Sequence, residues 1–273
     1  MNYRHIYHAG NFADIIKHLT LISILGKLRS KESPFAVLDS FAGSGSYDLA
    51  SELALKTSES CQGIKKLITH SNIIAPSNIP NLLQEFINIV KVSNNSSIYP
   101  GSPLFIQHML RPDDRLIMCE LHPEEYAALK KLLRVDVHNM DGYLALKAFL
   151  PFKENRGLIL LDPPFEVTSE FNKLLDSLNI IKKRARSICI LIWYPIKNAK
   201  EVSLFYQNYQ TIGYKETLKI EFEIFNYHKN MNKCGVLVIN PPNIKDEIKE
   251  TMRYITKYVY LNQAYCNIEI IQD

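Results

Sequence analysis

The chain has 273 residues, of which 47% are hydrophobic and 22% charged, a balance typical of a folded globular protein and not of a disordered one. Its net charge of +4 and isoelectric point near 8.6 are mildly basic, which permits an anionic partner such as nucleic acid. No apolar run approaches the ~18 residues of a membrane span, and no signal peptide is visible, so we expect a cytoplasmic protein without membrane contact.

The N-terminal residues 2–12 interleave aromatic side chains with Arg4, His5 and a second histidine. Such a mixture suits contact with nucleic acid, through stacking and phosphate neutralisation, and it equally suits an ordinary docked terminus. Apolar residues at helical spacing then predict a helix over 13–29.

A short strand is predicted over 35–39, and a glycine-rich loop follows it. Gly43 and Gly45 permit a tight turn and a close approach of the backbone to a ligand, and Asp39 adds an acceptor at the strand end. This G-x-G lacks the third glycine of a dinucleotide fingerprint, so it favours S-adenosylmethionine over a nicotinamide cofactor.

Residues 48–98 show helical patterns and no strand pattern, and we interpret them as a helical insertion after the glycine loop. The strand pattern returns at 115–119, directly before Glu120, a position typical of a carboxylate that binds ribose hydroxyls. A short strand over 135–137 precedes Asp141, another acidic loop residue.

The stretch 157–165 carries the strongest chemical signal. Its apolar run predicts a strand buried on both faces, which ends at Asp162. Two prolines stiffen the next loop, and Phe165 follows. Such a loop presents a carboxylate, backbone carbonyls and an aromatic face, which suit a flat ring bearing an amine. The alternative is that Asp162 caps a turn and Phe165 is core.

A fifth strand is predicted over 187–193, and two strands without a helix between them follow at 216–225 and 235–239. The last residues of the chain are expected to form a short extra strand or a tail. Alternating strands and helices followed by this hairpin predict an α/β fold with a mixed seven-stranded sheet. We expect a main domain of residues 1–47 and 99–273, with 48–98 inserted as a helical subdomain. The five cysteines contain no C-x-x-C, and no metal is expected.

Several motifs together resemble one family. Asp39–Gly45 resembles the first motif of class I methyltransferases, and Asp162–Phe165 resembles the D-P-P-[Y/F/W] motif of amino-group methyltransferases. The wider chain is similar to the RlmJ family, the bacterial 23S ribosomal RNA adenine-N6 methyltransferases. That resemblance is carried by Tyr3–His18, Tyr99–Pro103, Glu120–Pro123, Asp141–Gly142, Trp193–Pro195 and Asn240–Pro242.

The resemblance implies a Rossmann-like fold, S-adenosylmethionine as cofactor and specific roles for many residues. The residues implied to bind the cofactor are Lys17, His18, Phe41, Gly43, Ser102, Glu120, Asp141, Gly142 and Asp162. Those implied to act on the target adenine are Asp162, Pro163 and Phe165, and those implied to contact RNA are Tyr3, Arg4 and His5. Phe41 departs from the histidine often found there, and Phe165 from a common tyrosine.

We therefore expect a monomeric enzyme that methylates N6 of one adenine in 23S ribosomal RNA, either naked or in an early assembly particle. Three alternatives remain open from the residues themselves. The first is an amino methyltransferase that acts on DNA adenine or on a protein side-chain amide. The second is a non-catalytic RNA-binding protein on the same fold. The third, and least favoured, is a nicotinamide dehydrogenase.

Overall fold

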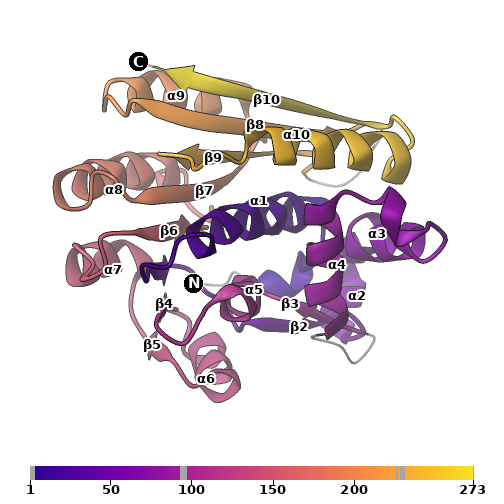
Figure 1. Cartoon of the computed structure of the whole chain (residues 1–273), viewed down its shortest axis with the longest axis horizontal. Coiled ribbons are helices and arrows are strands. Elements are labelled where there is room, and N and C mark those ends of the chain that lie inside the picture. The colour runs from indigo at the N-terminus through magenta and orange to yellow at the C-terminus, as the bar shows by residue number, and fades with distance from the viewer. Residues whose placement is uncertain (1–3, 93–96, 226, 228–230, 273) are drawn as a thin grey trace.

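The computed structural model describes residues 4–92, 97–225, 227 and 231–272. One sheet of eight strands organises it, in the order β10-β8-β9-β7-β6-β1-β4-β5 (Figure 1). The five strands from β7 to β5 are parallel, and β9, β8 and β10 add antiparallel pairs. The strands of this sheet are β1 Ala36–Asp39, β4 Arg115–Cys119, β5 Asp136–His138, β6 Gly157–Leu161, β7 Cys189–Pro195, β8 Glu216–Ile224, β9 Lys233–Ile239 and β10 Ala264–Gln272.

The α/β class predicted from the sequence is confirmed, but the sheet has eight strands and not the expected seven. The additional strand is β10, at the end of the chain, which pairs with β8 along its whole length. Its apolar residues Cys266, Ile268 and Ile270 alternate with polar ones and pack against the first core, a strand signal that the prediction of seven strands did not use. As an edge strand it needs no second apolar face.

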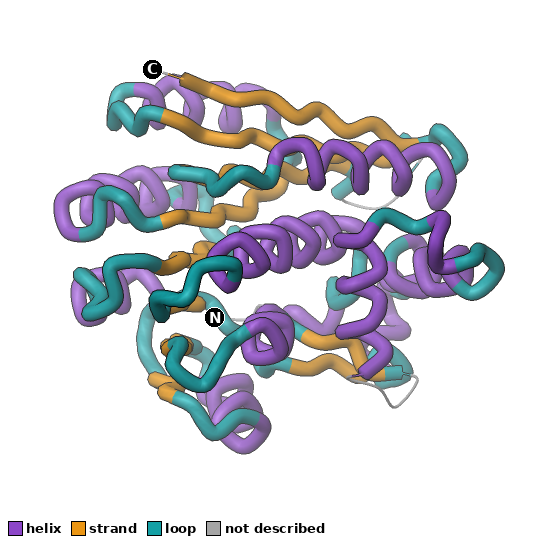
Figure 2. Tube along the Cα trace, viewed as in Figure 1, coloured by secondary structure: helices purple, strands orange, loops and turns teal. Residues whose placement is uncertain are grey.

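Helices cover both faces of the sheet, because side chains of the central strands alternate between two cores. In β6, Leu158 and Leu160 enter one core, while Ile159 and Leu161 enter the other. The first core is covered by α1 Phe12–Arg29, α5 Ser102–Met109, α6 Pro123–Leu132, α10 Lys245–Tyr254 and the π-helical turn η4 Ile255–Val259. The second is covered by α7 Gly142–Phe149, α8 Glu170–Arg184 and α9 Ala199–Gln210 (Figure 2).

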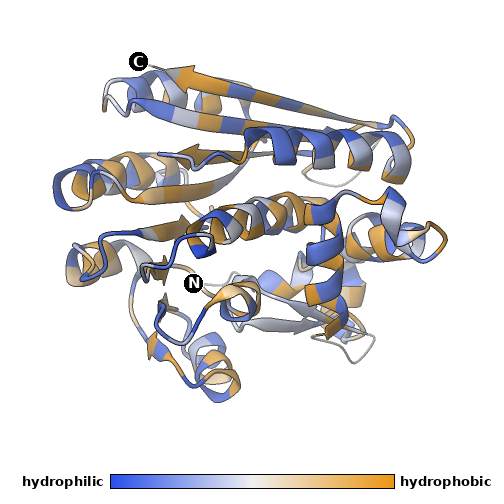
Figure 3. Ribbon diagram, viewed as in Figure 1, coloured by the Kyte–Doolittle hydropathy of each residue, from blue (hydrophilic) through white to orange (hydrophobic). Residues whose placement is uncertain are grey.

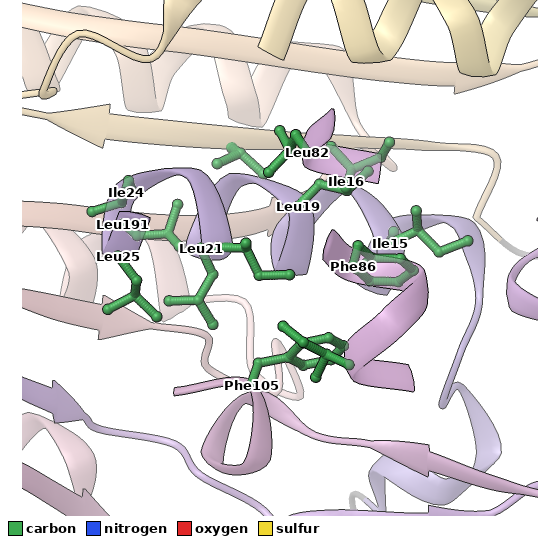
Figure 4. Close-up of a cluster of buried hydrophobic side chains, with 14 of the residues drawn as sticks. Ile15, Ile16, Leu19, Leu21, Ile24, Leu25, Leu82, Phe86, Phe105 and Leu191 are labelled. Atoms are coloured by element: carbon green, nitrogen blue, oxygen red, sulfur yellow. The ribbon is translucent and has the colours of Figure 1, made fainter. Parts of the chain in front are cut away.

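Helix α1 is the most deeply buried helix on its face. It packs against α4 and α5 and over the strands, with side chains contributed by Leu82, Phe86, Phe105 and Leu191 (Figure 4). Figure 3 shows the central strands as mainly hydrophobic, whereas α10 is largely hydrophilic and lies at the surface. Each helix in the described part of the chain is too short or too polar to span a bilayer.

The segment predicted as an insertion is mainly helical, as expected, but its helices are short. It contains α2 Glu52–Thr57, η2 Glu59–Gln62, α3 Ile64–Ser71, η3 Pro76–Asn78 and α4 Asn81–Val92. Two strands that the sequence did not predict, β2 Ser46–Asp48 and β3 Ile98–Pro100, pair with each other where the segment leaves and rejoins the sheet. Its apolar residues share a core with α1, and the division into subdomains stays a prediction.

Candidate active site

A cavity of about 280 Å³ lies at the carboxyl ends of the parallel strands β1, β4 and β6. Ligand sites of α/β sheets lie at this edge, because the loops that follow the strands converge there. The cavity brings together ten residues singled out from the sequence: His5, Lys17, His18, Phe41, Gly43, Ser102, Glu120, Asp141, Gly142 and Asp162.

Lys17 joins the N-terminal helix to the Asp162 loop. Its Nζ donates to Asp162 Oδ2 at 2.5 Å and to Asp14 Oδ1 at 2.8 Å, and its side chain is 5% exposed. Burial alone would lower the pKa of the Lys17 ammonium, but the two carboxylates outweigh it and raise that pKa above its usual value. Lys17 therefore stays charged and fixes the orientation of the Asp162 carboxylate.

Asp14 is held by the chain that precedes it. His5 Nε2 lies 2.9 Å from Asp14 Oδ2, and the backbone N–H of Gly10 donates to the same oxygen at 2.9 Å. Asn11 caps α1 by accepting from the N–H of Asp14 at 2.9 Å. Although burial opposes ionisation, His5 and Lys17 hold the pKa of Asp14 well below its usual range. The N-terminal segment is thus connected to Asp162 through a continuous polar chain.

Two of the predicted RNA-contacting residues have a described position. His5 lines the cavity, whereas Arg4 lies at the surface in an ion pair with Glu124. Tyr3 lies outside the described residues. The insertion supports this part of the chain, because Glu59 lies 3.1 Å from the ring of His8 and accepts from Asn11 at 3.0 Å.

Two glycines lie where the wall of the cavity has no room for a side chain. Gly43 has a φ of +62°, and a Cβ there would lie 2.2 Å from the hydroxyl of Tyr47. A Cβ on Gly142 would lie 2.1 Å from the backbone oxygen of Ser40. Both distances are far inside van der Waals contact, so neither position accepts a side chain without movement of the backbone or of Tyr47.

Glu120 ties the loop after β1 to the loop after β4. Its carboxylate accepts from the N–H of Gly43 at 2.8 Å and from the N–H of His122 at 2.6 Å. Burial raises the pKa of Glu120 despite these two donors. Each carboxylate oxygen has a second lone pair, so Glu120 can still accept hydrogen bonds from ligand hydroxyls.

Two buried polar groups beside the cavity lack partners within the described chain. Neither oxygen of Asp39 makes a well-formed hydrogen bond, although Ser102 and the backbone of Phe41 lie close, and burial raises the pKa of Asp39 to about 7. His18 Nδ1 lies 2.8 Å from the hydroxyl of Tyr99, while Nε2 is unpartnered. Burial and then Lys17 lower the pKa of His18, so its ring is neutral. Buried unpaired polar groups are costly, and a polar ligand in the cavity would satisfy that of His18, which lines it.

Pro163 and Phe165 do not line the cavity, although their neighbour Pro164 does. Phe165 has a φ of +49°, which is unusual for an aromatic residue and holds the loop in a sharp turn. Its ring meets Phe171 and Trp193 edge-on, with centroid distances of 5.1 and 5.9 Å. The ring therefore packs against the second core, and its stacking on a base stays a prediction.

The cavity contains further residues that sequence reasoning did not assign to it. Some neighbour a recognised motif and could have been found by adjacency, as Tyr143 follows Gly142. Others, such as Glu170 on α8, give no local signal. The residues missed are Ala42, Tyr47, Gly101, Leu121, His122, Glu125, Tyr143, Pro164, Glu166, Val167, Glu170 and Lys173. Tyr143 donates to Glu170 at 2.5 Å, which joins α7 to α8 at the cavity.

Comparison with known proteins identifies close relatives along nearly the whole chain. Residues 32–270 match the family model described as "Ribosomal RNA large subunit methyltransferase D, RlmJ". The chain is 36% identical over 251 residues to ribosomal RNA large subunit methyltransferase J of Escherichia coli (strain K12), covering 89% of this chain and 88% of the relative. It is 33% identical over 268 residues to the protein of the same name from Haemophilus influenzae, covering 94% and 93%.

A solved structure agrees with these matches. The crystal structure of a protein from Legionella pneumophila (strain Philadelphia 1) superposes with a TM-score of 0.87 at 35% sequence identity. The superposition covers 96% of this chain and 98% of that protein. Both the sheet and the segments added to it are therefore shared with a protein of known structure.

Proposed function

The chain belongs to the RlmJ family of ribosomal RNA large subunit methyltransferases, and we propose that it transfers a methyl group from S-adenosylmethionine to N6 of an adenine in 23S ribosomal RNA. The family and cofactor expected from the motifs are confirmed by this membership. The observation that carries the proposed reaction is the D-P-P-F loop, which presents Asp162 to the cavity at the carboxyl edge of β6.

The residues around the cavity fit S-adenosylmethionine. Glu120 can accept from ribose hydroxyls, and Gly142 lets a flat ring approach the backbone where a Cβ would intrude. His18 lines the cavity, and its Nε2, which has no hydrogen-bond partner among the described residues, offers a polar contact to the amino-acid part of the cofactor. When bound, the cofactor supplies an electrophilic methyl group.

Asp162 orients the amine that accepts the methyl group. Its Oδ2 is occupied by Lys17, and Oδ1 has no hydrogen-bond partner in the described structure. Oδ1 can therefore accept one hydrogen of the adenine amine and would take up that proton as the new N–C bond forms. The carbonyl of Pro163, which does not line the cavity in this structure, would accept the other hydrogen once the base is bound. With both hydrogens bound, the nitrogen becomes pyramidal and its lone pair points along one direction. Positioning of this kind supplies much of the acceleration of a group transfer.

The target base enters from the side of the D-P-P-F loop. It must leave its stack in the RNA or lie in an unpaired region to reach such a cavity. Phe165 would stack on it, a contact worth about 1–3 kcal/mol. Tyr3, Arg4 and His5 would contact the flanking RNA, with Arg4 exchanging Glu124 for a phosphate. The enzyme would act in the cytoplasm as a monomer, on naked 23S RNA or an early assembly particle.

The test uses ribosomal RNA from a strain that lacks this protein. Purified protein and labelled S-adenosylmethionine are incubated with the RNA, which is then digested to identify the modified nucleoside. We expect N6-methyladenosine in the 23S fraction, no product with Asp162→Asn, and full activity with Asp176→Asn, an exposed aspartate on α8. Label in DNA adenine or protein amide instead would refute the substrate, and near-normal activity of Asp162→Asn would refute the role of Asp162.

A further inference from the structure

Two long stretches of the sequence contain no acidic residue. Residues 60–84 and 251–268 have neither aspartate nor glutamate, yet together they include Lys65, Lys66, Arg253 and Lys257. The second stretch also has tyrosines at 254, 258, 260 and 265. The proposed reaction uses none of these residues. Cations interleaved with aromatic side chains are suited to bind a nucleic-acid backbone and its bases.

The fold places these two stretches side by side, although almost 170 residues of sequence separate them. His70 Nε2 on α3 lies 3.1 Å from the hydroxyl of Tyr254 at the end of α10. Lys66 Nζ lies 4.9 Å from the ring centroid of Tyr260, whose hydroxyl donates to the backbone oxygen of Gln62 at 2.8 Å. In Figure 1, α3 and the end of α10 adjoin each other at the right of the view.

Strand register places this surface at the same edge of the sheet as the cavity. β8 runs parallel to β7, because both are antiparallel to β9. The end of β8, Ile224, pairs with Ala264, the start of β10, and η4 directly precedes that start. On the other side, the N–H of Ile64 donates to the oxygen of Gly10 at 2.8 Å. The surface therefore adjoins the N-terminal segment whose His5 lines the cavity.

The cations of this surface are accessible. Lys65, Arg253 and Lys257 are exposed, and no ion pair holds any of them in the structure as described. Tyr258 is 46% exposed, and Lys257 Nζ lies 4.9 Å from its ring centroid. Asp246 and Glu250 line the same groove as Arg253 and Lys257, but none of the three exposed cations is held in an ion pair among the described residues, so each is available to a phosphate.

We propose that α3, the last turn of α10 and η4 form a docking surface for the phosphate backbone of the RNA substrate, here called the α3–η4 surface. This inference rests on the proposed function and adds a task for the insertion, which supplies α3. The surface would hold RNA that flanks the target adenine, while the cavity receives the base. Phosphate contacts fix the position of the RNA without reading its sequence.

The test removes three exposed charges from the α3–η4 surface in the variant Lys65→Gln/Arg253→Gln/Lys257→Gln. The matched control is Lys153→Gln/Lys183→Gln/Lys215→Gln, which removes three exposed lysines near the opposite, amino edge of the sheet. Both variants have the same net charge. RNA affinity is measured as a function of salt by filter binding, and kcat, KM for RNA and the cofactor dissociation constant are measured alongside.

We expect the α3–η4 variant to bind RNA on the order of 10–100-fold more weakly, and the slope of log K against log salt to fall by about 2–3. Its kcat at saturating RNA and its cofactor affinity should equal those of the wild type. An equal loss in the control would show that net charge alone matters, and unchanged affinity would show that RNA does not use this surface. Either result would refute the role of the α3–η4 surface. If the wild-type protein still methylates RNA in the same experiment, the proposed function is retained. A wild type that neither binds nor methylates RNA refutes both.

Discussion

The buried carboxyl of Asp39 predicts an unusual dependence of stability on pH. It lies at the end of β1, 0% exposed, without a well-formed hydrogen bond among the described residues. Because burial disfavours its charged form, its pKa rises from 3.8 to about 7. Below pH 3.8 both states hold the proton. Between pH 3.8 and 7 the unfolded chain releases it first, so the free energy of unfolding falls as pH rises.

The loss in the free energy of unfolding follows from the difference between the folded and unfolded pKa of Asp39. About 3 pKa units correspond to about 4 kcal/mol of lost stability above pH 7, at about 1.4 kcal/mol a unit. Near pH 5 the loss is only about 1.5–2 kcal/mol, because folded Asp39 is still protonated there. Asp39→Asn removes the charge and keeps the shape. Its stability relative to wild type should therefore rise by about 2–3 kcal/mol from pH 5 to pH 8.

Urea unfolding at several pH values, without cofactor, measures this difference. The change with pH is the informative quantity, since an amide at this site has its own constant effect on stability. Asp136→Asn serves as the control, because Asp136 is exposed at the start of β5. If the stability difference between Asp39→Asn and wild type is the same at pH 5 and pH 8, Asp39 does not titrate as its burial demands, and the reasoning fails.

Lys17→Met should lower the free energy of unfolding by about 3–5 kcal/mol and abolish methyl transfer, because it leaves the carboxylates of Asp14 and Asp162 without their shared cation. A loss of stability below about 1 kcal/mol in urea unfolding would contradict this. Gly142→Ala should weaken cofactor binding at least ~10-fold by calorimetry, since a backbone oxygen occupies the space that the added Cβ needs. The control Gly26→Ala has open space around it, so it should bind the cofactor normally and gain up to about 1 kcal/mol of stability. Phe165→Tyr should retain methyl transfer and Phe165→Ala should lose about 5- to 150-fold in kcat/KM, as expected for a stacking contact of 1–3 kcal/mol; equal rates for the two variants would remove that role.

The parts of the fold that local pattern controls were predictable. The β6 run from Gly157 to Leu161 is buried along its length, as an unbroken apolar run at the centre of a parallel sheet must be. Asp162, Glu120 and Gly43 each follow a predicted strand, and parallel strands place their carboxyl ends at one edge. Residues that are far apart in the sequence can therefore line one cavity, and the structure brings these three together. The alternation of Cys266, Ile268 and Ile270 with polar residues also signalled a strand, but its full pairing with β8 was decided by the tertiary structure.

The sequence by itself determined the α/β class, the family and the loops that carry the chemistry, because short motifs encode turns, strand ends and ligand-sized gaps locally. Only the tertiary structure decided which charges meet. Lys17 is 145 residues from Asp162, and nothing in a helical pattern says that its ammonium lies against that carboxylate. The meeting of α3 with η4, and the entry of Glu170 into the cavity, likewise depend on how helices rotate and pack on the sheet. Packing of whole faces sets those rotations, and no single segment contains that information.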